Sequence, residues 1–151
     1  MIHSAVMTSD FEAASKIYLD ANCIIYFIER ADKYQEKMKD LIGFATDKGI
    51  GLACSEIGIA ECLYGAFKLG SEALAGVYHE VFYEIGLFEL SPVNGERAIA
   101  AAQLGAEKSL KLIDALHFHA ALEMQCDIFL TNDERIQSSH GMTVVQLKNL
   151  L

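Results

Sequence analysis

Short apolar runs alternate along this chain with longer stretches of helical periodicity. Runs of about four residues, many of them rich in β-branched or aromatic side chains, are typical of short strands, whereas apolar residues repeated every three or four positions indicate amphipathic helices. The predicted strands are 16–19 (KIYL), 51–54 (GLAC), 87–90 (LFEL), 128–131 (IFLT) and 143–145 (TVV). The predicted helices are 21–29, 33–47, 56–69, 71–85, 95–107 and 113–124. Strands separated by helices predict right-handed crossover connections and therefore a parallel sheet.

The overall hydrophobicity favours a sheet that is covered on both faces. Apolar residues make up 52% of the 151 residues, which is high for a sheet with one face in water, and the length suits one domain rather than two. We therefore expect a three-layer α/β/α fold with a central parallel sheet of four or five short strands. Residues 16–151 form this single domain, and residues 1–15 are an N-terminal extension. Ser55 and Asn94 are candidate N-caps of the helices that follow them.

The start of the chain and the cysteines favour a cytoplasmic protein. No apolar run reaches the roughly 18 residues that a membrane span needs, and MIHSAVMTSD lacks the pattern of a secretory signal. The four cysteines (Cys23, Cys54, Cys62 and Cys126) include no CxxC pair. We therefore expect buried, reduced thiols rather than a zinc site or a disulfide framework.

The chain is acidic, with 12 Lys and Arg against 21 Asp and Glu and a net charge of −9. General polyanion binders are usually basic, because Lys and Arg neutralise phosphates. The composition therefore argues against tight, non-specific binding of nucleic acid. It allows a local acidic pocket for metal ions, and it suits a basic protein partner.

Two apolar runs end abruptly on small polar side chains and a carboxylate. One is KIYLDANCIIY at 16–26 and the other is IFLTNDERI at 128–136. In open parallel sheets, functional sites form beyond the carboxyl ends of the strands. Asp20 and Asp133 both follow predicted strands, so we expect them at the same edge of the molecule.

Two further acids lie in apolar surroundings, Glu61 within IGIAECLYG and Asp114 within LKLIDALHFHAAL. A carboxylate in such a setting is costly unless it is paired, hydrogen-bonded or bound to a metal. Simpler roles are open for two of the four acids. Asp20 suits a helix cap, and Asp114 suits an acid at a helix N-terminus.

Three segments together give the chain a family resemblance: YLDANCIIYF, SEIGIAECLYGA and IDALHFHAALEMQCDIFLTNDERI. The chain resembles a PIN domain, and in particular the VapC-like toxin nucleases of toxin–antitoxin pairs, from about Lys16 to Val145. The resemblance implies a metal-dependent endoribonuclease, acting on tRNA or other structured RNA, with a cognate antitoxin as partner and a homodimer as the assembly.

The resemblance also assigns residues. Asp20, Glu61, Asp114 and Asp133 correspond to the acidic quartet that binds Mg²⁺ or Mn²⁺, with one or two ions. Asn22 and Thr131 order the site by hydrogen bonds, with Asn132 beside them. These hard ions prefer oxygen ligands. We expect Asp20 and Asp114 as principal ligands, with Glu61 or Asp133 orienting the attacking water.

Several other residues near the expected site have more than one open interpretation. His117 follows Asp114 by three positions and shares its helix face, so it suits a phosphate contact, a partner of the ligands or simple packing. Lys108, Lys111 and Arg135 suit contacts with RNA phosphates or ordinary solvated roles. Apolar side chains of the helices over 33–47 and 56–85 suit the core, a dimer face or an antitoxin groove.

Two other functions remain open at the level of sequence. One is a PIN-fold binding module that acts mainly through protein partners. The other is a phosphatase with Asp20 as nucleophile, although Asp20-Ala-Asn22 lacks the second carboxylate of a DxD loop.

Overall fold

The computed structural model describes residues 9–29 and 32–150, which contain one five-stranded sheet. Its strands are β1 (Lys16–Leu19), β2 (Gly51–Ser55), β3 (Glu89–Ser91), β4 (Ile128–Thr131) and β5 (Thr143–Gln146). The strand order is β3-β2-β1-β4-β5, and every neighbouring pair is parallel. The predicted parallel α/β fold is confirmed.

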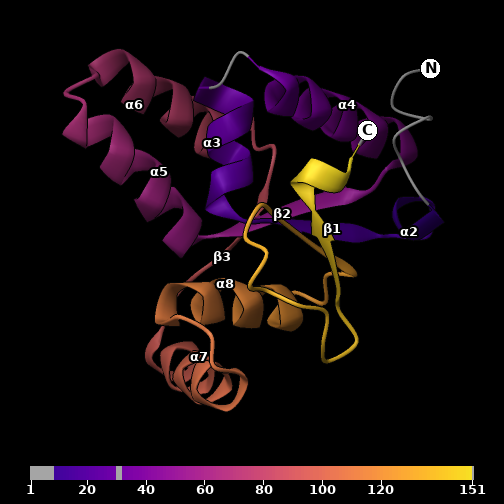
Figure 1. The fold of residues 1–151 in the computed structure, drawn as a ribbon. Coiled ribbons are helices and arrows are strands. Elements are labelled where there is room, and N and C mark those ends of the chain that lie inside the picture. Colours follow the sequence, from indigo (N-terminus) through magenta and orange to yellow (C-terminus); the bar gives the residue numbers. More distant parts are fainter. Residues whose placement is uncertain (1–8, 30–31, 151) are drawn as a thin grey trace.

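Helices cover both faces of this sheet (Figure 1). They are α2 (Ser9–Glu12), α3 (Ala21–Glu29), α4 (Lys33–Lys48), α5 (Glu56–Lys68), α6 (Glu72–His79), α7 (Gly95–Lys108) and α8 (Leu112–Glu123). Figure 1 shows α7 and α8 together on one side of the sheet and α3 to α6 on the other. The connections therefore build the three layers that the alternating pattern predicts.

Alternate side chains of the central strands enter two separate cores. Ile17 and Leu19 of β1 belong to the apolar cluster that includes residues of α3 to α6. Tyr18 points the other way and joins Phe129 of β4 and Phe118 of α8 in the second cluster. Because successive side chains of a strand face opposite sides, doubly covered strands have no polar face. That explains why they read as unbroken apolar runs.

The segment between α5 and α7 differs most from the predicted elements. The helix predicted at 71–85 is α6 followed by the π-helical segment η1 (Glu80–Glu84), in which the N–H of Ile85 donates to the carbonyl of Glu80 at 2.8 Å. Val81 and Phe82 are both buried at this wider turn. The strand predicted at 87–90 is observed at 89–91, because its pairing with β2 begins at Ala53 opposite Glu89.

The chain also forms ordered structure before β1. Phe11 in α2 is fully buried within the larger apolar cluster. The backbone N–H groups of Ser15 and Lys16 donate to the carboxylate of Asp127. Part of the predicted extension, residues 9–15, thus packs against the domain, whereas residues 1–8 of that extension and the final residue 151 lie outside the described residues.

The two predicted caps behave differently. Asn94 caps α7 by accepting from the N–H of Arg97 at 3.0 Å, as predicted. Ser55 occupies the N-cap position of α5 but makes no side-chain capping bond. Its hydroxyl is bonded elsewhere, as described below.

All four cysteines are buried with free thiols, as predicted from their spacing. Burial raises the pKa of Cys54 and of Cys126, each to about 12, so both are held as neutral thiols. Across residues 9–29 and 32–150, no helix combines the length and apolar character that a membrane crossing requires.

Candidate metal centre

Asp20 lies immediately after β1, at the carboxyl end of the sheet, and is 6% exposed. One carboxylate oxygen accepts from the hydroxyl of Thr131 at 2.7 Å, and the other accepts from the backbone N–H of Ala21 at 2.9 Å. Thr131 ends β4, the neighbouring strand. The two strand ends that the sequence singled out therefore meet through a direct hydrogen bond.

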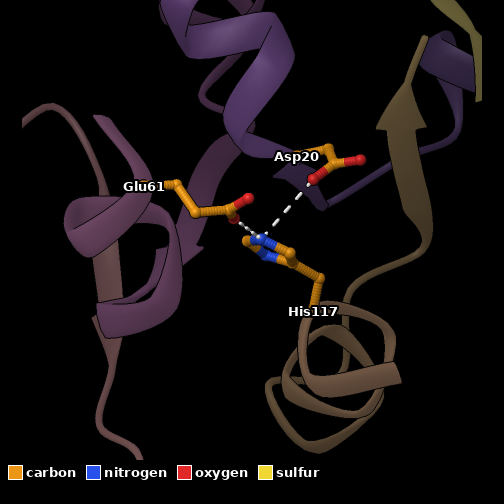
Figure 2. A group of neighbouring side chains, drawn as sticks. All are labelled: Asp20, Glu61 and His117. Atoms are coloured by element: carbon orange, nitrogen blue, oxygen red, sulfur yellow. Dashed lines mark hydrogen bonds and ion pairs between the residues drawn. The ribbon is translucent and has the colours of Figure 1, made fainter. Parts of the chain in front are cut away.

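Glu61 of α5 and His117 of α8 approach Asp20 from two different helices (Figure 2). The Nε2 atom of His117 lies 2.5 Å from Oε1 of Glu61 and 3.5 Å from Oδ1 of Asp20. One ligand atom from each of the three residues lies within 4.8 Å of the other two. The side chains thus converge from three elements on a common point.

His117 is held in place by a second set of bonds behind its ring. Its Nδ1 atom lies 2.7 Å from the hydroxyl of Tyr18, and that hydroxyl donates to the Oγ atom of Ser55 at 2.9 Å. Both ring nitrogens of His117 are therefore engaged, Nδ1 by the Tyr18 hydroxyl and Nε2 by the carboxylates of Glu61 and Asp20.

The charge on His117 follows from its neighbours. Burial lowers the pKa of His117, but the hydrogen bond to Glu61 and the charges of Asp20, Glu61 and Asp114 outweigh it. The net pKa of His117 is therefore raised. With 1% exposure, the ring is enclosed by protein groups.

Asp114 lies in the first turn of α8, three residues before His117. Burial raises its pKa, and the charges of Asp133 and Asp20 raise it further, while Arg135 and His117 act in the opposite direction. The three carboxylates at positions 20, 114 and 133 therefore lie close enough to repel one another.

Asp133 is paired with a cation at the edge of this group. Its carboxylate accepts from Nε of Arg135 at 3.0 Å and from Nη2 at 2.7 Å. The hydrogen bonds and charge of Arg135 lower the pKa of Asp133, and the exposed Lys111 contributes in the same direction. Asp133 is thus held ionised but turned toward Arg135 in this structure.

The amides near the site link the two strand ends. The side-chain oxygen of Asn22 accepts from the backbone N–H of Asn132 at 3.2 Å, and its side-chain nitrogen lies 3.4 Å from Asp20. The side-chain nitrogen of Asn132 reaches the hydroxyl of Tyr26 at 3.3 Å. These contacts keep the segments after β1 and β4 in fixed register.

The group of side chains suits a hard divalent cation. Carboxylate oxygens of Asp20 and Glu61 converge with His117, and the pKa of nearby Asp114 is raised by burial and then by the negative charges of Asp133 and Asp20. An ion with oxygen preference relieves the repulsion between these carboxylates. Even with a protonated His117, the carboxylates of Asp20, Glu61 and Asp114 would leave the site with an excess of negative charge.

Two residues of this site were not anticipated from the sequence. Tyr18 reads as an apolar strand residue, and Ser55 reads as a helix cap. The only signal in the sequence is that both end or nearly end a strand on the side where the site forms, which is too general to identify them. His117 was noted, but its enclosed position between Tyr18 and Glu61 depends on the packing of α8.

The raised pKa of Asp114 predicts a pH-dependent stability difference between the wild type and Asp114→Asn. A raised carboxyl pKa means that the folded state releases this proton less readily than the unfolded state, so ionisation of Asp114 destabilises the fold as the pH rises through that pKa. In EDTA, the stability of Asp114→Asn relative to wild type should therefore increase between pH 3.5 and pH 7. Urea unfolding at both pH values measures the difference. Equal differences at the two pH values would contradict the crowding of carboxylates described above.

Comparison with known proteins gives consistent results for sequence and structure. The family model described as PIN domain matches residues 17–139, well over half of the chain. No curated protein matches the chain significantly by sequence.

Solved structures share the fold at low sequence identity. A chain of VapBC2 from Rickettsia felis, bound to a DNA fragment from their promoter, is 16% identical, with a TM-score of 0.67 over 87% of this chain and 98% of that chain. DNA-bound VapBC from Salmonella typhimurium gives 19% identity and a TM-score of 0.64, covering 87% and 98%. A chain of a toxin–antitoxin complex from Klebsiella pneumoniae is 20% identical, with a TM-score of 0.63 over 87% of this chain and 97% of that chain.

Proposed function

We propose, because this chain belongs to the PIN domain family, that it is a divalent-metal-dependent endoribonuclease and the toxin of a type II toxin–antitoxin pair. The observation that carries the proposal is the convergence of Asp20, Glu61 and His117 at the carboxyl edge of the parallel sheet. Asp114 and Asp133 lie near enough to influence the same group electrostatically. This is the edge at which open parallel sheets form their functional sites.

The proposed roles are those that the family resemblance implies for these residues. Asp20 and Asp114 are the principal ligands of Mg²⁺ or Mn²⁺, one or two ions in all, and Glu61 or Asp133 orients the attacking water. A bound ion of this kind supplies a water of lowered pKa and neutralises charge that develops on the phosphodiester. Thr131, Asn22 and Asn132 hold the Asp20 segment in place through the hydrogen bonds described above.

His117 has a positioning role in this proposal. Its ring lies between Glu61 and Asp20 on one side and Tyr18 on the other, so it fixes the direction in which the Glu61 carboxylate points. Lys111 and Arg135 are exposed beside Asp133 and supply positive charge for RNA phosphates in a chain that is otherwise acidic.

The partner in this proposal is a cognate antitoxin protein. The support is the fold shared with chains of VapBC and of a toxin–antitoxin complex. The net charge of −9 suits a partner segment of basic character. A homodimer and a cytoplasmic location belong to the same proposal.

Metal binding and RNA cleavage test the proposal directly. We expect Mn²⁺ to bind the wild type in a calorimetric titration and to raise its unfolding free energy by about 2.7 kcal/mol at a concentration 100 times the Kd. tRNA and other structured RNAs should be cleaved in Mg²⁺ or Mn²⁺, and EDTA should stop the reaction. Absence of both Mn²⁺ binding and cleavage, together with co-purification of a protein partner, would support the binding module instead.

A further inference from the structure

A pocket of about 290 Å³ lies beside the carboxylate cluster, between the turn that joins α7 to α8 and the segment that follows β4. Two cationic side chains, Lys108 and Arg135, and two hydroxyl side chains, Ser138 and Ser139, line it. Arg135 is also the partner of Asp133 at 2.7 Å. Arg135 therefore links the pocket to Asp133, one of the acids of the proposed metal centre.

The apolar part of the lining comes from Leu110 and Phe118. Phe118 follows His117 directly in α8 and is 2% exposed, so only a small part of it faces the pocket. The pocket thus combines a small apolar surface with cations and hydroxyls. That combination is unusual in a chain with only 12 Lys and Arg residues.

Both sides of the pocket are fixed by the fold. On one side, Ser109 ends α7 with φ of 56°, and the N–H of Leu110 donates to the carbonyl of Gly105 at 3.0 Å. On the other side, buried Ile136 and Met142 anchor the segment between β4 and β5. The Oγ atom of Ser138 accepts from the N–H of Val144 at 2.9 Å within the same segment. The pocket is therefore preformed, which lowers the ordering cost of binding.

The size and chemistry of the pocket suit a small ligand with an anionic group. Sites for drug-sized ligands begin at roughly 300 Å³, so this pocket is at the lower end of the range. Arg135 binds Asp133 through Nε and Nη2, and Nη1 is outside that pair. Lys108 is exposed at the rim. A phosphate is the anion that such cations bind most readily next to a nuclease centre.

We propose that this pocket holds one unpaired nucleotide of the RNA strand, next to the phosphodiester that is cleaved. The phosphate lies against Lys108 and Arg135, the base lies over Leu110, and Ser139 bonds to the edge of the base. The inference rests on the proposed ribonuclease function and adds to it a subsite for an unpaired base. Such a subsite favours loops and single strands over duplex RNA, whose bases are stacked and paired.

Binding of small nucleotides to the full-length protein in EDTA tests the pocket without any cleavage. The probes are the four ribonucleoside 5′-monophosphates, ribose 5-phosphate and inorganic phosphate, each followed by the backbone amide signals in NMR spectra. We expect saturable shifts at residues 108–110 and 135–139 with at least one nucleotide. Ribose 5-phosphate should bind several-fold more weakly, because it lacks the apolar contact of the base with Leu110 and the hydrogen bond to Ser139. Equal binding of nucleotide and ribose 5-phosphate, or shifts confined to other residues, would overturn the proposal.

A matched pair of lysine variants separates the pocket from general charge effects. Lys108→Ala should weaken the binding of all four nucleotides several-fold and should reduce the dependence of oligonucleotide binding on salt by about one phosphate contact. Lys39→Ala removes an exposed lysine of α4 that pairs with Glu36 on its own helix, and it should leave binding unchanged. Equal losses in the two variants would also overturn the proposal.

The outcomes distinguish the pocket from the ribonuclease. If the wild type cleaves RNA but shows no nucleotide binding at 108–110 and 135–139, the proposed nucleotide pocket is wrong and the proposed ribonuclease function is retained. Nucleotide binding at these residues in a protein that cleaves no RNA overturns the ribonuclease and retains the pocket as a nucleotide site.

Discussion

The Asp20→Asn variant is expected to cleave RNA at least about 1,000-fold more slowly than the wild type in Mn²⁺. A metal ion contributes several kcal/mol of charge stabilisation in reactions of this kind, and about 4 kcal/mol corresponds to three orders of magnitude in rate. The substitution replaces an anionic ligand by a neutral amide of the same shape. The hydrogen bond from Thr131 retains an acceptor, provided that the amide oxygen takes the position of Oδ2.

The measurement is single-turnover cleavage of a labelled RNA, together with a Mn²⁺ titration. Glu36→Gln provides the matched control, since it neutralises an exposed carboxylate of α4 that is distant from the cluster, and it should keep full activity. Cleavage by Asp20→Asn at a rate near that of the wild type would show that the activity arises elsewhere, either in a contaminant or at a different site.

The Phe129→Ala variant is expected to lose about 3–5 kcal/mol of unfolding free energy, the usual cost of truncating a fully buried aromatic side chain. Phe129 is 0% exposed in β4 and stacks on Tyr18 with ring centroids 5.3 Å apart. Its ring also packs against that of Phe118, with ring centroids 5.4 Å apart. The loss corresponds to a decrease in Tm on the order of 10 °C. Thermal and urea unfolding in EDTA measure it.

This core also supports the candidate site. Tyr18, stacked on Phe129, carries the hydroxyl that fixes His117, so Phe129→Ala should weaken Mn²⁺ binding as well. Ile99→Ala is the control, because Ile99 is 72% exposed on α7, and its effect should stay within about 0.5 kcal/mol. A loss below 1 kcal/mol for Phe129→Ala would mean that this face of the sheet is packed more loosely than described.

The central strands could be predicted from the sequence because burial on both faces leaves an unmistakable apolar run. β1 and β4 begin and end at the predicted residues. β3 is harder to predict, because it lies at the edge of the sheet and its register depends on pairing with β2. The π-helical turn at Glu80–Glu84 buries the adjacent residues Val81 and Phe82. The spacing of apolar residues in the sequence predicts a helix there but not its wider turn.

In the candidate site, too, some features could be predicted from the sequence and others could not. The meeting of the segments after β1 and β4 follows from the topology of a parallel sheet, and the bond between Thr131 and Asp20 agrees with it. The orientation of a side chain does not follow from topology. Ser55 bonds to Tyr18 instead of capping α5, and Asp133 turns to Arg135, because each choice depends on which partner the packed helices bring within reach.

The order of strands in the sheet also has a consequence for synthesis of the protein. β1 comes before the other four strands in the sequence and lies between β2 and β4 in the sheet. Its neighbour β4 comes much later, at residues 128–131. A growing chain on the ribosome therefore carries the first two acids of the cluster long before Thr131 and His117 arrive to hold them. The assembled cluster therefore exists only after residue 131 has been made, and fragments that end before this residue lack it.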